Sequence, residues 1–108
     1  MKKLCLALLL ATAASSSFAG QATGRVVHYL IGNNGMFFFR VDGTSGLAGC
    51  NTMSEFALNL NAEKSAPAKA IMASVLAAYI EGKPIMVQGT GACDIWYDRE
   101  TVAHIFVN

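Results

Sequence analysis

The chain has few charged residues and no surplus of either sign. Lysine, arginine, aspartate and glutamate make up 14% of its 108 residues, and the formal net charge is +1. A nearly neutral chain offers no electrostatic attraction to nucleic acid or to an anionic membrane surface. We therefore expect no nucleic acid among its partners and no membrane association once a leader peptide is removed.

The chain also lacks an apolar run that could span a bilayer, which takes about 20 residues. The apolar residues 4–14 are too few, and they follow a pair of lysines. Ser17-Phe18-Ala19 then places small residues at the two positions that a signal peptidase recognises. Residues 1–19 are therefore predicted to be a cleaved signal peptide, and residues 20–108 a single periplasmic or secreted domain.

Cysteine is scarce, with three residues in the whole chain. Cys5 lies in the predicted signal peptide, so only Cys50 and Cys93 remain after cleavage. Two cysteines in an exported protein most often pair with each other. The alternative, a metal-binding thiolate pair, lacks the short spacing and histidine partners of a zinc site. We predict a Cys50–Cys93 disulfide and neither a metal nor another cofactor.

Motifs of catalysis are missing as well. The only histidines are His28 and His104, and no serine has the Gly-x-Ser-x-Gly setting of an activated nucleophile. Gly43, Gly46 and Gly49 lack the lysine and the strand-to-helix context of a phosphate loop. The two histidines could support acid–base chemistry only in a shared cleft beside a carboxylate. The sequence therefore favours a protein without enzymatic activity.

β-Forming residues predict an N-terminal hairpin. Residues 25–31 and 36–41 are its strands, since Gly32-Asn33-Asn34-Gly35 between them accepts the positive φ angles of a tight turn. The return strand is apolar on both faces, so we expect both faces to be covered. Residues 42–54 are rich in glycine and serine and are predicted to form a loop.

The later strands have weaker patterns. Residues 55–60 alternate, which predicts Phe56, Leu58 and Leu60 facing inward and Glu55, Ala57 and Asn59 facing outward. Further strands are predicted over residues 85–88 and 101–107, with a short addition at 94–97 and a polar turn at 98–100.

One helix is predicted between Ser65, a capping residue, and Gly82, which suits the left-handed position after a helix end. Its apolar residues form a stripe predicted to face the core: Ala68, Ile71, Met72, Val75, Leu76 and Tyr79. The opposite face carries small residues and little charge: Ala66, Ala70, Ala73 and Ala77. Since outer helical faces of monomers usually carry more charge, we expect a homo-oligomer formed through this face.

This order of elements defines the expected fold class. A hairpin, a strand, a helix and two or three further strands indicate an α+β domain with a mostly antiparallel sheet. With five or six strands and the helix between the third and fourth, we predict a small OB-like barrel. A curved sheet with the helix on one face is the alternative.

Residues 93–100 concentrate the chain's recognition chemistry, with its only tryptophan, a tyrosine, three acids and an arginine. Aromatic faces beside polar groups are typical of sugar- and protein-binding surfaces. The ligand-binding candidates are Asp94, Trp96, Tyr97, Asp98 and Arg99. The alternative is that Trp96 covers one end of the sheet next to the disulfide.

The layout also resembles a known family. Cys50-Asn51, Phe56-Ala57-Leu58, the helix end Ala77–Pro84 and Cys93-Asp94 resemble small exported bacterial proteins related to the binding subunit of subtilase-type cytotoxins. The likeness covers about residues 24–107. It implies an OB-like fold, a ring of five subunits and glycan binding.

Together, these observations predict an exported, non-enzymatic binding module, with a glycan or a protein as its ligand, that forms a subunit of an oligomer. The alternative is a small periplasmic hydrolase or an enzyme inhibitor.

Overall fold

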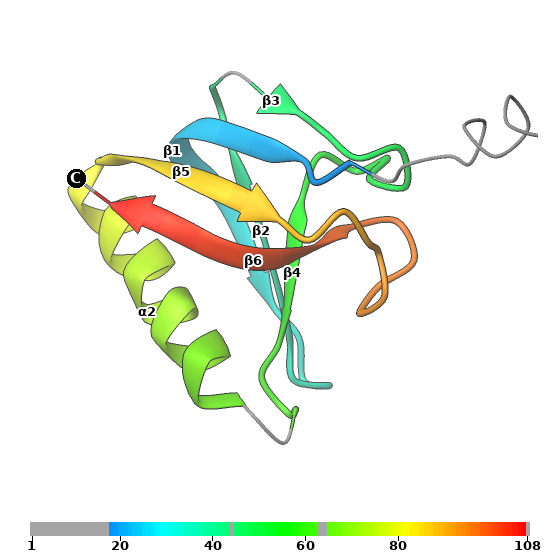
Figure 1. The fold of residues 1–108 in the computed structure, drawn as a ribbon. Helices are drawn as coiled ribbons and strands as arrows, with labels where there is room; N and C mark the ends of the chain where they lie inside the picture. The colour runs from blue at the N-terminus through cyan, green and yellow to red at the C-terminus, as the bar shows by residue number, and fades with distance from the viewer. Residues whose placement is uncertain (1–17, 44, 63–64, 108) are drawn as a thin grey trace, which may run out of the picture.

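The computed structural model describes residues 18–43, 45–62 and 65–107, and Figure 1 shows their arrangement. The predicted signal peptide lies outside the described residues, apart from Phe18 and Ala19. In chain order the elements are β1 (Gln21–Ile31), β2 (Met36–Val41), β3 (Ser45–Gly46), β4 (Phe56–Asn59), α2 (Ser65–Glu81), β5 (Pro84–Gly89) and β6 (Glu100–Val107). Among the described residues, no helix is long and apolar enough to cross a membrane.

The domain is α+β, with a mostly antiparallel six-stranded sheet and one described helix, as predicted. The strand order is β2-β4-β6-β5-β1-β3, and β1 also pairs with β2. The pairings β1–β2–β4–β6–β5 therefore return to β1. Only the short contact between β4 and β6 is parallel.

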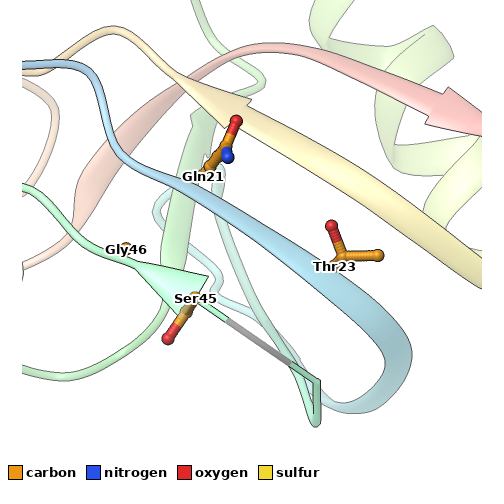
Figure 2. A pocket seen from close by; sticks show the side chains of 4 residues that line it. All are labelled: Gln21, Thr23, Ser45 and Gly46. Carbon is orange, nitrogen blue, oxygen red and sulfur yellow. The ribbon is translucent and has the colours of Figure 1, made fainter.

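The N-terminal strands differ from the prediction in two places. β1 begins at Gln21, before the predicted start, and its first residues pair with both β5 and β3. β3 lies in the segment that was predicted to be a loop. The sequence gives no sign of this strand, because two residues are too few to show any alternation. The helix consequently lies between β4 and β5 rather than between the third and fourth strands. A hollow of about 310 Å³ beside β3 is lined by Gln21, Thr23, Ser45 and Gly46 (Figure 2).

The hairpin and the helix end form as predicted. Gly35 has a φ of 84°, and Gly32 N–H donates to the Met36 carbonyl at 2.8 Å to close the β1–β2 turn. At the end of α2, Gly82 has a φ of 68°. Lys83 N–H then donates to the Ala78 carbonyl at 3.1 Å, the bond that ends a helix in a Schellman motif. Local turn chemistry thus fixes both reversals.

The face of α2 that packs on the sheet is rotated slightly from the predicted stripe. Val75 and Ala78 are buried at its centre. Tyr79, predicted to face the core, is half-exposed instead and contacts Tyr29 edge-on, with ring centroids 5.2 Å apart. Successive helical residues turn by about 100°, so Tyr79 falls on the flank of a helix centred on Ala78.

The core lies between the sheet and α2 (Figure 1) and is dominated by phenylalanine. Phe37, Phe39 and Phe56 form a row of rings with centroid separations of 5.8 and 6.0 Å. The inward faces of β2 and β4 are therefore as predicted. Burying each such ring stabilises the fold by about 2–3 kcal/mol.

The outward face of β4 contradicts the prediction. Ala57 and Glu55, expected in solvent, are buried. Their burial results from the segment between β5 and β6, which folds back over this face instead of extending away from it. The segment is anchored there by the bond from Thr52 N–H to the Asp98 carbonyl, at 3.1 Å.

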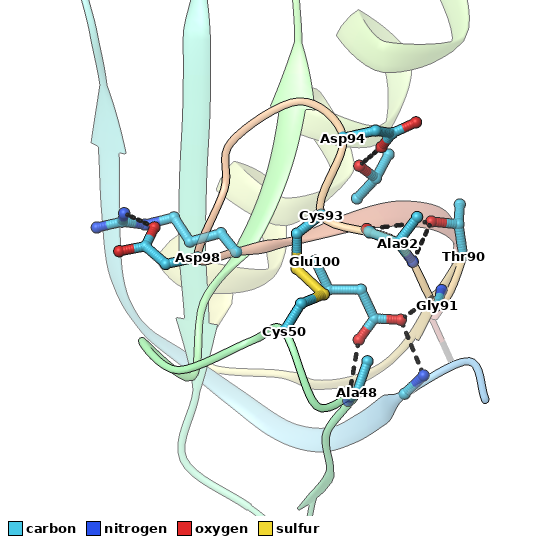
Figure 3. The surroundings of a disulfide bond; sticks show 12 residues. Ala48, Cys50, Thr90, Gly91, Ala92, Cys93, Asp94, Asp98 and Glu100 are labelled. Carbon is cyan, nitrogen blue, oxygen red and sulfur yellow. Dashed lines mark hydrogen bonds and ion pairs between the residues drawn. A yellow bond between two sulfur atoms is a disulfide. The ribbon is translucent and has the colours of Figure 1, made fainter. Parts of the chain in front are cut away.

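The predicted disulfide between Cys50 and Cys93 is confirmed, with a Cα–Cα distance of 6.1 Å. It joins the loop after β3 to the segment between β5 and β6 (Figure 3). Next to it lies Glu100, which was expected in a polar turn but begins β6 and is fully buried. Its carboxylate accepts hydrogen bonds from Gly20 N–H and Gly91 N–H, both at 2.8 Å, and from Ala48 N–H at 3.4 Å.

Candidate functional site

The segment between β5 and β6 carries all five candidate ligand-binding residues, but not as the predicted short strand. Within residues 94–97 only an isolated bridge forms, between Trp96 and Arg99. Arg99 N–H donates to the Trp96 carbonyl at 3.2 Å and closes a four-residue turn. This turn brings the two aromatic side chains and the arginine to one side of the sheet.

Trp96 and Arg99 pack on the outward side of β2. The indole contacts the Phe38 ring edge-on, with centroids 5.5 Å apart, and the Arg99 guanidinium lies over the same ring at 4.5 Å. A cation over an aromatic face is attracted by the ring quadrupole. Phe38 is buried by these contacts, which explains why β2 is covered on both faces as expected.

Arg99 is held in place by two carboxylates. Its Nε donates to Glu55 at 2.5 Å and its Nη1 to Asp98 at 2.7 Å. The Glu55 side chain is only 7% exposed, so this ion pair is largely shielded from water. Burial alone would lower the pKa of Arg99, but the hydrogen bond and charge of Glu55, with those of Asp98, raise it above its ordinary value. The guanidinium therefore stays charged and fixed on Phe38.

Tyr97 is the most exposed aromatic side chain in this segment, at 78%. Its ring lies 6.4 Å from that of Trp96, tilted by 31°. Trp96 itself is half-buried. We call the surface formed by Phe38, Glu55, Trp96, Tyr97 and Arg99 the loop patch. It presents one free aromatic ring on a base fixed by an ion pair and a disulfide.

Asp94 does not join the loop patch. Its carboxylate accepts a hydrogen bond from the Thr101 hydroxyl on β6, whereas Asp98 binds Arg99 (Figure 3). The two acids therefore have separate structural partners and do not form an opposed catalytic pair.

Sequence reasoning missed the role of Glu55. This residue precedes a strand whose alternation predicts an outward side chain, and it does face outward, but the β5–β6 segment covers it. Its second oxygen lies 3.2 Å from Nε2 of His28. No single-residue signal could reveal this, because Glu55, His28 and Arg99 come from three distant parts of the chain.

The two histidines lie on different strands and contact different residues. His28 contacts Glu55 on the loop-patch side of β1, while His104 stacks edge-on against Phe106 at 5.3 Å on β6. Among the described residues, the side-chain contacts of Glu55 include His28 and Arg99 but not His104.

Comparisons of this chain with protein-family models, with curated proteins and with solved structures find no match. Within the part of the chain that the structure describes, no three His, Cys, Asp or Glu side chains gather as a metal site. A proposal about function therefore depends on the chemistry of the loop patch.

Proposed function

We propose that the mature protein is an exported, non-enzymatic binding module that holds a glycan on the loop patch. The observation that carries this is the exposed Tyr97 ring beside Trp96, on a base fixed by Arg99 and Glu55. Sugars bind by stacking their apolar faces on such rings while neighbouring polar groups fix the orientation. A rigid base reduces the entropy lost on binding.

The strand pairing supports an OB-like barrel as the finer description of the fold. The pairings return to β1, β4 and β6 are parallel, and the single described helix lies between β4 and β5. OB folds bind oligosaccharides and oligonucleotides on one sheet face and its adjoining loops. The loop patch lies on β2 and the β5–β6 segment, and the acids that hold its arginine, Glu55 and Asp98, disfavour a polyanion. This supports a sugar over a nucleic acid.

Export to the periplasm or the cell exterior belongs to the same proposal. The disulfide supports it, because such bonds persist in oxidising compartments. The predicted signal peptide, with its cleavage site between Ala19 and Gly20, would direct the chain to export.

We expect Tyr97→Ala to weaken glycan binding about thirtyfold, because truncating a central aromatic anchor costs about 2 kcal/mol or more. The melting temperature should stay unchanged, since the ring is 78% exposed. Retention on an array of neutral and acidic oligosaccharides, followed by Trp96 fluorescence titration with the sugar retained, measures this.

Phe106→Ala is the matched control for Tyr97→Ala, because Phe106 is an exposed aromatic residue on β6, outside the loop patch. It should leave the affinity unchanged. Absence of any retained oligosaccharide, or equal losses in both variants, would contradict the proposal. Trp96→Ala tests the proposal less directly, because Trp96 also covers Phe38 and its loss would affect both binding and stability.

The runner-up function, a small hydrolase, draws on one observation, the contact between His28 and Glu55. The carboxylate could orient the imidazole as a general base. The Arg99 ion pair opposes this, because it already engages the other Glu55 oxygen. We expect wild-type protein and His28→Ala to hydrolyse chromogenic esters and glycosides at the same background rate. A rate that depends on His28 would favour the hydrolase.

Self-association through the outer face of α2 completes the proposal. Ala66, Ala70, Ala73 and Ala77 are exposed, as is Ile80 at 82%. We expect Ala73→Glu with Ala77→Glu to convert an oligomer into folded monomers, since neither residue belongs to the core. Light scattering during size-exclusion chromatography measures this, and an unmodified protein that is monomeric at high micromolar concentration would contradict it.

A further inference from the structure

Glu100 is a fully buried carboxylate for which the described residues supply no cation. No lysine, arginine or histidine of the described residues forms an ion pair with it. Its described partners are the backbone N–H groups of Gly20, Ala48 and Gly91. Burying an ionised carboxylate is costly unless a counter-charge accompanies it. The three backbone donors offset part of this cost, and a cation at the site would offset more of it.

The shortest hydrogen bonds to this carboxylate come from Gly20 N–H and Gly91 N–H, each at 2.8 Å from Oε2. Gly20 is also the residue that would begin the mature chain. Hydrolysis of the Ala19–Gly20 peptide bond takes up one water, leaving a carboxylate on Ala19 and an amine on Gly20. An α-amine is protonated near neutral pH. Cleavage would thus convert the neutral donor facing Glu100 into a cation.

The surroundings of Gly20 are shaped to hold a chain end without a side chain. A Cβ on Gly20 would lie 2.7 Å from Ala48 N and would also collide with the Glu100 carboxylate. The Gly20 carbonyl accepts a hydrogen bond from Gly89 N–H at 2.8 Å, which fixes its position. Gly20 itself is buried. Backbone pockets of this kind are how proteins capture N-terminal amines.

We propose that signal-peptide removal creates a buried ion pair between the new Gly20 ammonium and Glu100, and that this pair locks the mature fold. The pair lies where the loop holding Ala48 and Cys50 meets the β5–β6 segment that carries the loop patch. Processing would therefore rigidify the binding surface at the moment of export. The inference rests on the cleavage site within the proposed function.

The test compares the protein that begins at Gly20 with one that keeps Ala19 as an extra first residue. The extension replaces the ammonium facing Glu100 by a neutral amide and moves the charge one residue away. We expect it to raise the unfolding equilibrium constant about ten- to hundredfold, less than removing one partner of a buried pair outright, because a neutral N–H still donates to the carboxylate. Thermal and urea unfolding measure the difference.

The same comparison in a Glu100→Gln background separates the ion pair from a steric effect of the extra residue. Without the carboxylate, the extension should change the unfolding equilibrium constant less than twofold. An equal penalty in both backgrounds, or none in either, overturns the proposal. Extending the C-terminus by one alanine is the matched control and should have no effect in either background.

Chemical reactivity gives an independent measurement that does not depend on stability. In the folded mature protein the Gly20 amine should acetylate at least tenfold more slowly than the exposed Lys83. In urea near neutral pH the order should reverse, because α-amines lose their proton at lower pH than lysine side chains. Free acetylation of native Gly20 overturns the proposal. Mass analysis of the exported protein tests the cleavage itself, since a start other than Gly20 removes this ion pair but leaves the glycan-binding test of Tyr97 untouched.

Discussion

Replacing both Cys50 and Cys93 by serine is expected to lower the free energy of unfolding by about 4 kcal/mol. The bond spans a sequence separation of 43 residues, so its loss returns considerable conformational freedom to the unfolded chain. Small domains have total stabilities of about 5–15 kcal/mol. For a domain of this size the melting temperature should fall by about 20 °C.

Thermal unfolding of the mature double variant measures this loss, and reduction of the wild-type protein should reproduce it. The intact mass of the exported wild-type protein should be lower than that of its reduced form by two hydrogens. Cys5→Ser is the control, because the predicted cleavage removes this residue. Native thiols that react freely with a labelling reagent, or a variant that melts with the wild-type protein, would contradict the prediction.

Local chemistry explains which parts of the fold the sequence predicted well. The Asn-Gly turn before β2 and the glycine after α2 are fixed by backbone preferences of single residues. The inward row of Phe37, Phe39 and Phe56 follows from alternation, which depends only on strand geometry. The expectation of an oxidising compartment was enough to pair the two cysteines. The turn, helix-end and alternation signals lie within a few residues of the features that they predict.

The candidate site was harder to predict, because its residues meet only in three dimensions. Alternation places Glu55 on the outer face of its strand, but it cannot say that a later segment covers that face. The alternation would be the same whether the Glu55 carboxylate were solvated or, as in the structure, bound to Arg99. The composition of residues 93–100 predicted Tyr97 and Arg99 as binding candidates. Phe38 and His28 lie beside Arg99 and Glu55 because of the sheet register, which the composition does not reveal.

Glu100 shows the same limit for stability. In sequence it follows Asp98 and Arg99, and three charged residues in a row usually form a solvated turn. In the fold, Arg99 turns outward to Phe38 while Glu100 turns inward beneath the disulfide (Figure 3). Gly89, opposite it in the structure, has no room for a Cβ because the carboxylate occupies that space. Because Gly89 on β5 has no side chain, the Glu100 carboxylate from β6 fits against it.

Glu100→Ala is accordingly expected to destabilise the domain by about 4 kcal/mol. The carboxylate is the acceptor for three backbone donors, on Gly20, Ala48 and Gly91. Hydrogen bonds to a charged group contribute about 1.5–3 kcal/mol each, and a buried donor left without a partner costs about 1–3 kcal/mol. Partial relaxation and water entry reduce the sum, so the loss falls in the 3–5 kcal/mol range for breaking a buried charged contact.

Glu100→Gln separates the hydrogen bonds from the charge. The amide oxygen can replace Oε2, which accepts from both Gly20 and Gly91, but the amide nitrogen then faces Ala48 N–H as a second donor. Glu100→Gln should therefore lower the free energy of unfolding by about half as much as Glu100→Ala does. Urea unfolding of the two variants measures this order, and Glu81→Ala, an exposed acid at the end of α2, is the control with a change below about 0.5 kcal/mol.

The effects of Glu100 and the disulfide should not be additive, because both fasten the loop after β3 to the β5–β6 segment. Once the Cys50–Cys93 bond is absent, these segments can separate, and the donors on Ala48 and Gly91 can reach water. Removing Glu100 should then cost less than in the oxidised protein, with a coupling of about 1 kcal/mol or more. A double-mutant cycle over Cys50, Cys93 and Glu100 that closes with no coupling would show that the two attachments act on independent parts of the fold.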